Sequence, residues 1–144
     1  MKKISAFVLT ILAAISMSAC SSKEPAQDTS LDDVLSKGEI TVAISPDFAP
    51  SEFKDPNTGE ILGSDVYVAQ YVADYLSKKY DKEINLKIEE MDFKTCQAAV
   101  QADTVDFSVN GFAATDDRKE NFYITSHYGK TRSSSTSYQG LLIN

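Results

Sequence analysis

The stretch that decides the fold is residues 105–120, V-D-F-S-V-N-G-F-A-A-T-D-D-R-K-E. Val105–Val109 alternates apolar and polar side chains, which is typical of a short strand. Asn110 and Gly111 follow, and both residue types tolerate the unusual backbone angles of a turn. Thr115 precedes two aspartates, which predicts a helix N-terminus, because a hydroxyl caps free N–H groups and carboxylates suit the helix dipole.

Arg118 stands in the first turn of that expected helix, where a cation opposes the dipole. A strand end, a glycine turn with exposed N–H groups, a helix N-terminus and a guanidinium together suit a carboxylate. We therefore expect a carboxylate-binding site here. The alternative is a surface ion pair between Arg118 and Glu120 or a neighbouring aspartate.

The pattern D-x(3)-N-G-x-x-x-T-D-x-R in this stretch resembles the extracytoplasmic solute-binding proteins of ABC importers, in the branch that binds polar amino acids (family 3 type). Ile40–Phe53, Asp55–Glu60 and Glu90–Phe93 follow the same family in the same order. The resemblance covers roughly residues 31–143, so it is far more specific than any single motif.

Strand and helix patterns alternate along the chain up to Val109, which predicts an α/β fold with a mainly parallel sheet and flanking helices. The resemblance implies the first lobe of a two-lobed, type II periplasmic-binding-protein-like fold, truncated near the hinge. We expect residues 31–144 to form this lobe, with the second lobe absent. Ligands of such open sheets bind beyond the carboxyl ends of the strands.

The individual elements are predicted from periodicity and capping residues. They are a helix from Leu31 to Lys37 capped by Ser30, a strand Glu39–Ser45, a loop Pro46–Pro50, a hairpin around 55–59, a helix from a cap at Ser64 or Asp65 to Lys79, a strand Ile84–Ile88, a helix from Phe93 to about Ala102 capped by Asp92, and strands at 121–125 and 138–143.

Two features inside these helices allow more than one interpretation. Tyr67, Tyr71 and Tyr75 are spaced by four residues, and we expect them to flank the buried face of their helix. A tyrosine docking surface is the alternative. Cys96 is expected to be a small buried hydrophobe rather than a reactive thiol.

The first nineteen residues predict a targeting segment, with Lys2 and Lys3 before an apolar run of signal-peptide length. Small residues precede Cys20 as in a bacterial lipobox, although Met17 stands where Leu is usual. We expect residues 1–19 to be a lipoprotein signal peptide, Cys20 to carry lipid, and residues 20–30 to be a flexible tether. The alternative is ordinary cleavage after Ala19, with Cys20 a free thiol.

Composition and charge limit the classes of function that are expected. The chain has 144 residues, 42% of them hydrophobic and 24% charged, which is ordinary for about one globular domain. Its net charge is −7 without a basic cluster in the body of the chain, so no nucleic-acid partner is expected. His127 is the single histidine, which gives no support to a histidine-rich metal site or a Ser-His-Asp site. We expect no metal, no cofactor and a monomer.

The resemblance also implies the ligand contacts. Arg118 pairs with the α-carboxylate, the backbone N–H of Ala113 adds a second donor, and the Gly111 carbonyl accepts from the α-ammonium. Phe48 and Phe93 match the aromatic positions that enclose the ligand side chain. Core packing is the alternative for both rings.

Four positions depart from the family pattern, and one of them is Ser51, which replaces a common Phe in the Ala-Pro-x-Glu-Phe run. Ala113 lacks the hydroxyl that relatives often carry, and Asn110 stands at the expected rim of the site. Ser45 replaces an acid that is common in binders of basic or amide ligands, which argues weakly against lysine, arginine or histidine as ligand.

The function that the resemblance implies is a substrate-binding lipoprotein, tethered outside a bacterial membrane through Cys20. It captures a polar amino acid and delivers it to the permease subunits of an ABC transporter, without catalysis. The alternatives are an enzyme of the dehydratase type or a sensor domain on the same fold, or a truncated fragment with no function.

Overall fold

The computed structural model describes residues 28–130 and 138–143. The helices are α1 (Ser30–Lys37), α2 (Ser64–Tyr80), α3 (Phe93–Gln101) and α4 (Asp116–Asn121). The strands are β1 (Glu39–Ile44), β2 (Asp47–Phe48), β3 (Glu52–Lys54), β4 (Ile61–Leu62), β5 (Asn85–Glu90), β6 (Phe107–Asn110), β7 (Tyr123–Ile124), β8 (Gly129–Lys130) and β9 (Tyr138–Ile143).

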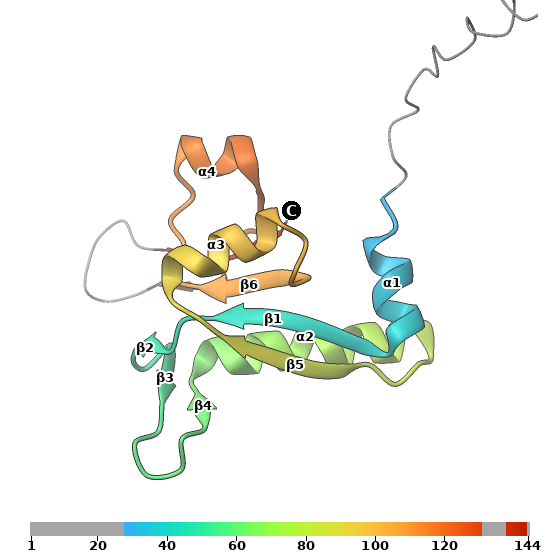
Figure 1. Ribbon diagram of the computed structural model, residues 1–144, viewed down its shortest axis with the longest axis horizontal. Helices are drawn as coiled ribbons and strands as arrows, with labels where there is room; N and C mark the ends of the chain where they lie inside the picture. Colours follow the sequence, from blue (N-terminus) through green and yellow to red (C-terminus); the bar gives the residue numbers. More distant parts are fainter. Residues whose placement is uncertain (1–27, 131–137, 144) are drawn as a thin grey trace, which may run out of the picture.

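The main sheet has the strand order β5-β1-β6-β9-β7, and β8 pairs with β9 off this path. β5, β1 and β6 are parallel, whereas β9 runs antiparallel to both β6 and β7. Figure 1 shows the arrowheads of the three parallel strands pointing to one end of the sheet. The small antiparallel sheet β2-β3-β4 lies at that end, and α1 lies at the other. The expected α/β architecture with a mainly parallel sheet is confirmed.

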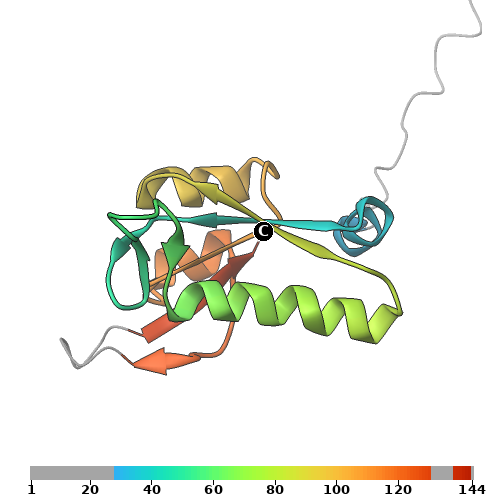
Figure 2. The ribbon, with the colours of Figure 1, turned by 90° about the horizontal axis from the view of Figure 1, so that it is seen from below.

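The two faces of the sheet are covered by different helices, with α2 on one side and α3 on the other (Figure 2). β1 explains this arrangement, because its alternate side chains point to opposite faces. Val42 and Ile44 belong to the core cluster that contains Ala69 and Ala73 of α2, while Ala43 belongs to the cluster of α3. The predicted alternation in this strand is confirmed, and both faces are buried.

Three local predictions are confirmed by hydrogen bonds. The Asp92 carboxylate accepts from the backbone N–H groups of Lys94 and Thr95 at the start of α3. The Thr115 hydroxyl accepts from the Arg118 N–H at 3.3 Å and caps α4. The chain between β3 and β4 turns at Asp55, whose Oδ1 accepts from Asn57 and Thr58 N–H groups at 2.7 and 3.2 Å.

The predicted caps of α1 and α2 are wrong. Ser30 is the first residue of α1, with Thr29 at the cap position, and no side chain caps the helix. Gly63 stands at the cap position of α2 with φ 128°, and Asp65 lies inside the helix with its side chain fully buried. Asp65 does not cap because its carboxyl group turns inward to a partner on β3, which sequence-local reasoning does not include.

Some boundaries also shift. Pro46–Pro50, expected to be loop, contains the two-residue strand β2. The strand expected at Ile84 begins at Asn85 and extends to Glu90. The strand expected at Val105 begins at Phe107, because Asp106 makes two hydrogen bonds to Thr41 of β1. Its backbone N–H donates to the Thr41 carbonyl, and its carboxylate accepts from the Thr41 N–H.

The tyrosine stripe of α2 faces solvent. Tyr67, Tyr71 and Tyr75 are 79%, 69% and 50% exposed, so the expectation that they flank the buried face of the helix is wrong. Tyr71 and Tyr75 stack on each other, with ring centroids 6.5 Å apart.

Of the two cysteines, only Cys96 lies among the described residues. Cys96 is fully buried and free, and burial raises the pKa of its thiol, which confirms the structural interpretation. The predicted signal peptide, Cys20 and most of the predicted tether lie outside the described residues. Within residues 28–130 and 138–143, no helix is both long enough and apolar enough to span a membrane.

Candidate functional site

The candidate site lies where the parallel strands β1, β5 and β6 end. Phe48 lies in β2, which follows β1, and β5 leads into α3 at Phe93. The loop after β6 carries Gly111 and Ala113 before the helix that holds Arg118. Because the three strands are parallel and adjacent, their carboxyl ends meet at one edge of the sheet. The topology therefore brings the three expected ligand-binding segments to one edge.

A buried hydrogen-bond chain ties the ends of β1 and β6 together. The Asn110 side chain accepts from the Ser45 N–H at 2.8 Å and donates to the Ser108 hydroxyl at 2.8 Å. That hydroxyl in turn donates to the Ala43 carbonyl at 2.8 Å. Asn110 is 0% exposed and Ser45 is 2% exposed. The expectation that Asn110 forms the rim of the site is wrong, because its amide satisfies buried backbone groups and so sets where the two loops begin.

The Arg118 side chain folds back over the loop that precedes its helix. Its Nη1 donates to the Ala113 carbonyl at 2.9 Å and its Nε donates to Gln97 Oε1 at 3.2 Å. Arg118 is half-buried. Within the described residues no carboxylate lies in ion-pair distance of it, and the three ion pairs found there all involve lysines. The alternative of a surface ion pair with Glu120 is therefore not formed.

Two aromatic rings support the guanidinium. Its central carbon lies 5.5 Å from the ring centroid of Phe93 and 5.6 Å from that of Phe112, which is cation–π range. The two rings contact each other with centroids 4.8 Å apart. Phe112 is fully buried, whereas Phe93 is half-buried and packs against the same core cluster. The guanidinium plane is thus held by two hydrogen bonds and two ring faces.

Phe48 and Gly111 form a second contact at this edge. A Cβ atom placed on Gly111 would lie 3.9 Å from two ring carbons of Phe48, so the ring rests beside the glycine backbone. Phe48 is 44% exposed. Core packing, the alternative considered for this ring, does not describe a side chain so open to solvent.

This arrangement is suited to binding an anion. A guanidinium has five N–H donors, and two of those of Arg118 have partners among the described residues. The remaining donors can engage a carboxylate through the planar fork. Since the charge is half-buried and held by fixed partners, little conformational entropy remains to be lost on binding.

An acidic pocket of about 450 Å³ opens beside the site, at the ends of β1 and β5. It is lined by three acidic residues, Asp47, Glu90 and Asp92, together with Ser45, Pro46 and Met91. Hydrogen bonds from Thr95 lower the pKa of Asp92, which favours its charged form. Glu90 is in part neutralised by Lys54, whose Nζ lies 2.6 Å from Glu90 Oε2. The pocket suits a cationic or hydrogen-bond-donating group.

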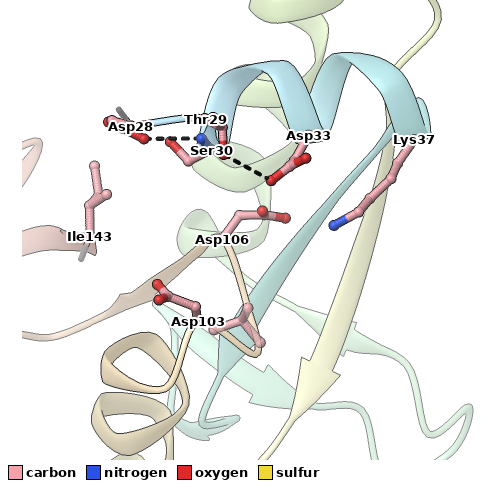
Figure 3. Close-up of a pocket in the computed structure, with 9 residues that line it drawn as sticks. Asp28, Thr29, Ser30, Asp33, Lys37, Asp103, Asp106 and Ile143 are labelled. Carbon is pink, nitrogen blue, oxygen red and sulfur yellow. Dashed lines mark hydrogen bonds between the residues drawn. The ribbon is translucent and has the colours of Figure 1, made fainter. Parts of the chain in front are cut away.

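A second pocket of about 320 Å³ lies at the opposite end of the sheet, beneath α1 (Figure 3). Two of its acidic side chains accept hydrogen bonds from backbone N–H groups. Asp28 accepts from the Ser30 N–H at 3.0 Å, and Asp106 accepts from the Thr41 N–H at 2.6 Å. It lies at the amino ends of β1 and β6, the end that open parallel sheets do not use for ligands.

A buried acidic cluster lies behind the site. Glu52 of β3 and Asp65 of α2 are 2% and 0% exposed. Burial, reinforced by the charge of Asp65, raises the pKa of Glu52 to about 9. Burial raises the pKa of Asp65, whereas the neighbouring Glu52, Tyr128 and Ser64 side chains lower it. Burial and the neighbouring Asp65 also raise the pKa of the Tyr128 hydroxyl.

The described residues contain no group of three or more histidine, cysteine, aspartate or glutamate side chains placed to hold a metal ion. His127 is exposed and lies between β7 and β8.

Sequence reasoning missed three participants. Gln97 follows Phe93 by four residues and so shares its helix face, a spacing that could have pointed to it. Phe112 lies within residues 105–120, but no local pattern predicts its contact with Arg118. The Glu52–Asp65 contact joins residues from two elements, and no local pattern indicates it.

Comparison with known proteins gives a family. The model of the bacterial extracellular solute-binding proteins, family 3, matches residues 40–139. The arginine-binding protein ArgT of Corynebacterium glutamicum is 31% identical over 86 residues, 60% of this chain and 26% of that protein. The probable ABC transporter extracellular-binding protein YckB of Bacillus subtilis is 30% identical over 128 residues, 85% of this chain and 42% of that protein. The chain thus spans less than half the length of either relative.

Solved structures of amino-acid-binding proteins are similar to this chain. The arginine-bound form of domain 1 of the T. maritima arginine-binding protein superposes with a TM-score of 0.67 at 29% identity, over 78% of this chain and 84% of that one. A Streptococcus pneumoniae amino acid ABC transporter substrate-binding protein bound to L-arginine gives 0.61 at 34% identity, over 69% and 40%. An ancestral cyclohexadienyl dehydratase gives 0.60 at 24% identity, which shows a shared fold alone.

Proposed function

Because the chain belongs to the bacterial extracellular solute-binding proteins of family 3, we propose that its site binds a free amino acid through the α-carboxylate and presents it to the permease of an ABC transporter. The geometry of Arg118 carries this proposal. A half-buried guanidinium held by two hydrogen bonds and two aromatic faces, with donors left over, matches a carboxylate and requires no further chemistry.

The other expected contacts belong to the same proposal. The Ala113 N–H supplies a second donor to the carboxylate, and the Gly111 carbonyl accepts from the α-ammonium. Phe48 and Phe93 enclose the ligand side chain from two sides. Support comes from their placement, since Phe93 contacts the Arg118 guanidinium and Phe48 rests beside Gly111 at the same edge of the sheet.

We further propose a cationic amino acid, with L-arginine as the probe. The acidic pocket beside the site supports this choice, because Asp47 and Asp92 would attract a cationic side chain. The related proteins named above as arginine-binding support it as well. The absence of an acid at position 45 is only a weak argument against a basic ligand, because Ser45 is 2% exposed and its backbone N–H donates to Asn110.

Membrane attachment through a lipid on Cys20, an extracytoplasmic location and a monomeric state complete the proposal. The membership in an extracellular family and the apolar run before Cys20 support the first two. Catalysis is not proposed, because the family and its named relatives are solute-binding proteins, and the dehydratase neighbour shares only the fold.

The experiment that tests this function is calorimetric titration with a panel of ligands that each lack one recognised group. L-Arginine is compared with agmatine, which lacks the carboxylate, with L-glutamine, which keeps the backbone groups without the side-chain charge, and with L-glutamate. We expect L-arginine to bind, agmatine to lose binding, and L-glutamate to bind weakest of the three amino acids. Equal binding of L-arginine and agmatine would refute the carboxylate role.

A further inference from the structure

The feature that the proposed function does not use is the buried pair Glu52 and Asp65. Glu52 lies on β3 and Asp65 in the first turn of α2, and they are 2% and 0% exposed. The two elements are held together next to the pair, because the Asp65 N–H donates to the Ser51 carbonyl at 2.9 Å. Gly63 makes this approach possible, since a Cβ there would lie 2.1 Å from the same carbonyl oxygen.

Two ionised carboxylates in one buried site repel each other and are both poorly solvated. The groups placed against Glu52 are Asp65 from α2, Asp47 from β2 and the Gly111 N–H from the loop after β6. Those placed against Asp65 are Glu52, Tyr128 from the loop between β7 and β8, and the Ser64 hydroxyl, which donates at 3.3 Å. These neighbours favour the charged form of Asp65, whereas Glu52 faces two other acids, so Asp65 is the charged member of the pair.

Glu52 also touches the candidate site. The Gly111 N–H lies against its carboxyl group and favours the charged form. In the β2–β3 pairing Glu52 is directly opposite Phe48, and the Phe48 ring in turn rests beside Gly111. Glu52 is thus connected to both members of the Phe48–Gly111 contact, although it does not itself face the expected ligand position.

We propose that Glu52 and Asp65 share one proton at neutral pH, and that Glu52 in this state is a positioning residue for the amino-acid site, holding the Gly111 backbone and Phe48 in place. The shared proton stands on the structure of the pair. The positioning role rests on the function proposed above.

The pH dependence follows from the raised pKa of Glu52, about 9 against an ordinary value of 4.5. An acid that holds its proton more tightly in the folded state contributes stability that is fully present below the unfolded pKa. That contribution is lost progressively as the pH rises from 4.5 to about 9. Across this window the native state carries one proton more than the unfolded state.

The first experiment tests the proton itself, on the full chain. Infrared difference spectra at pH 7 are recorded for wild type, Glu52→Gln and, as a matched control in the same hairpin, the exposed Glu60→Gln. We expect a protonated-carboxyl band in wild type and Glu60→Gln that is missing in Glu52→Gln. In Asp65→Asn, removal of the neighbouring charge should make the band disappear at a lower pH. A wild-type spectrum at pH 7 without such a band would overturn the proposal.

The same variants are unfolded in urea between pH 5 and pH 9. One extra native proton makes the unfolding constant of wild type rise about tenfold more per pH unit than that of Glu52→Gln, which holds a neutral side chain at every pH. Glu60→Gln should follow wild type. Parallel curves for wild type and Glu52→Gln would overturn the shared proton.

The second experiment tests positioning through L-arginine affinity at pH 7 and pH 10. The ligand titrates in this range too, so the quantity measured is the ratio of the wild-type and Glu52→Gln affinities, in which ligand titration cancels. We expect similar affinities at pH 7 and a severalfold advantage for Glu52→Gln at pH 10. A ratio independent of pH, with the infrared band present, would overturn the positioning role. Absence of binding in every variant would instead contradict the proposed function and leave the infrared result to decide the proton.

Discussion

Replacing Arg118 by alanine is the perturbation that tests the site most directly. The guanidinium is half-buried, with bonds of 2.9 and 3.2 Å to Ala113 and Gln97. Truncating one partner of a buried charge pair costs about 2–5 kcal/mol in affinity, whereas fully exposed pairs contribute about 0–1 kcal/mol. Since Arg118 lies between these limits, we expect a loss of about 2 kcal/mol, which is roughly thirtyfold in Kd.

The assay is isothermal titration of L-arginine into wild type, Arg118→Ala, Arg118→Lys and Lys119→Ala. Arg118→Lys keeps the charge but loses the planar fork, so it should recover only part of the lost affinity. Lys119 is a matched control, because this exposed neighbour pairs with Asp116 at 3.4 Å. Circular dichroism of each variant verifies that the fold is retained. An unchanged affinity in a folded Arg118→Ala variant would refute the assignment of the carboxylate site.

The remaining predictions concern stability, anchoring and affinity. Gly63→Ala should destabilise the protein by about 2 kcal/mol in urea unfolding, because the φ angle of Gly63 is 128° and the new Cβ would meet the Ser51 carbonyl. Gly59→Ala should cost only about 1 kcal/mol, since nothing lies within 4 Å of the new Cβ there. Equal losses of stability in the two variants would contradict the steric argument. Cys20→Ala should abolish metabolic labelling with fatty acid and release the protein from membranes, because stable anchoring needs more than one acyl chain, and an unlabelled wild type would exclude a lipoprotein. Residues 21–144 expressed alone should bind L-arginine on the order of millimolar, because charge pairs open to water contribute little, and micromolar affinity would show that this part of the site suffices.

Some of the structure follows from the sequence alone. The alternation in β1, the Asp92 and Thr115 caps and the turn at Asp55 are all confirmed. Each depends on groups within a few residues of one another, because periodicity and capping bonds are local. The edge of the sheet that carries the candidate site was predictable for a related reason, since alternating strands and helices produce parallel strands whose ends coincide.

Other features were decided only by tertiary structure. Asn110 was expected at the rim but is buried, because it bonds to Ser45, 65 residues away in the chain. Asp65 was expected to cap a helix but turns inward to Glu52, and Arg118 takes its direction from Gln97 and the Phe93 ring. These orientations depend on which distant groups are present to satisfy a buried polar atom or to support a charge. The sequence by itself therefore determined the elements and the edge where the site forms, while packing between distant segments decided which side chains face it.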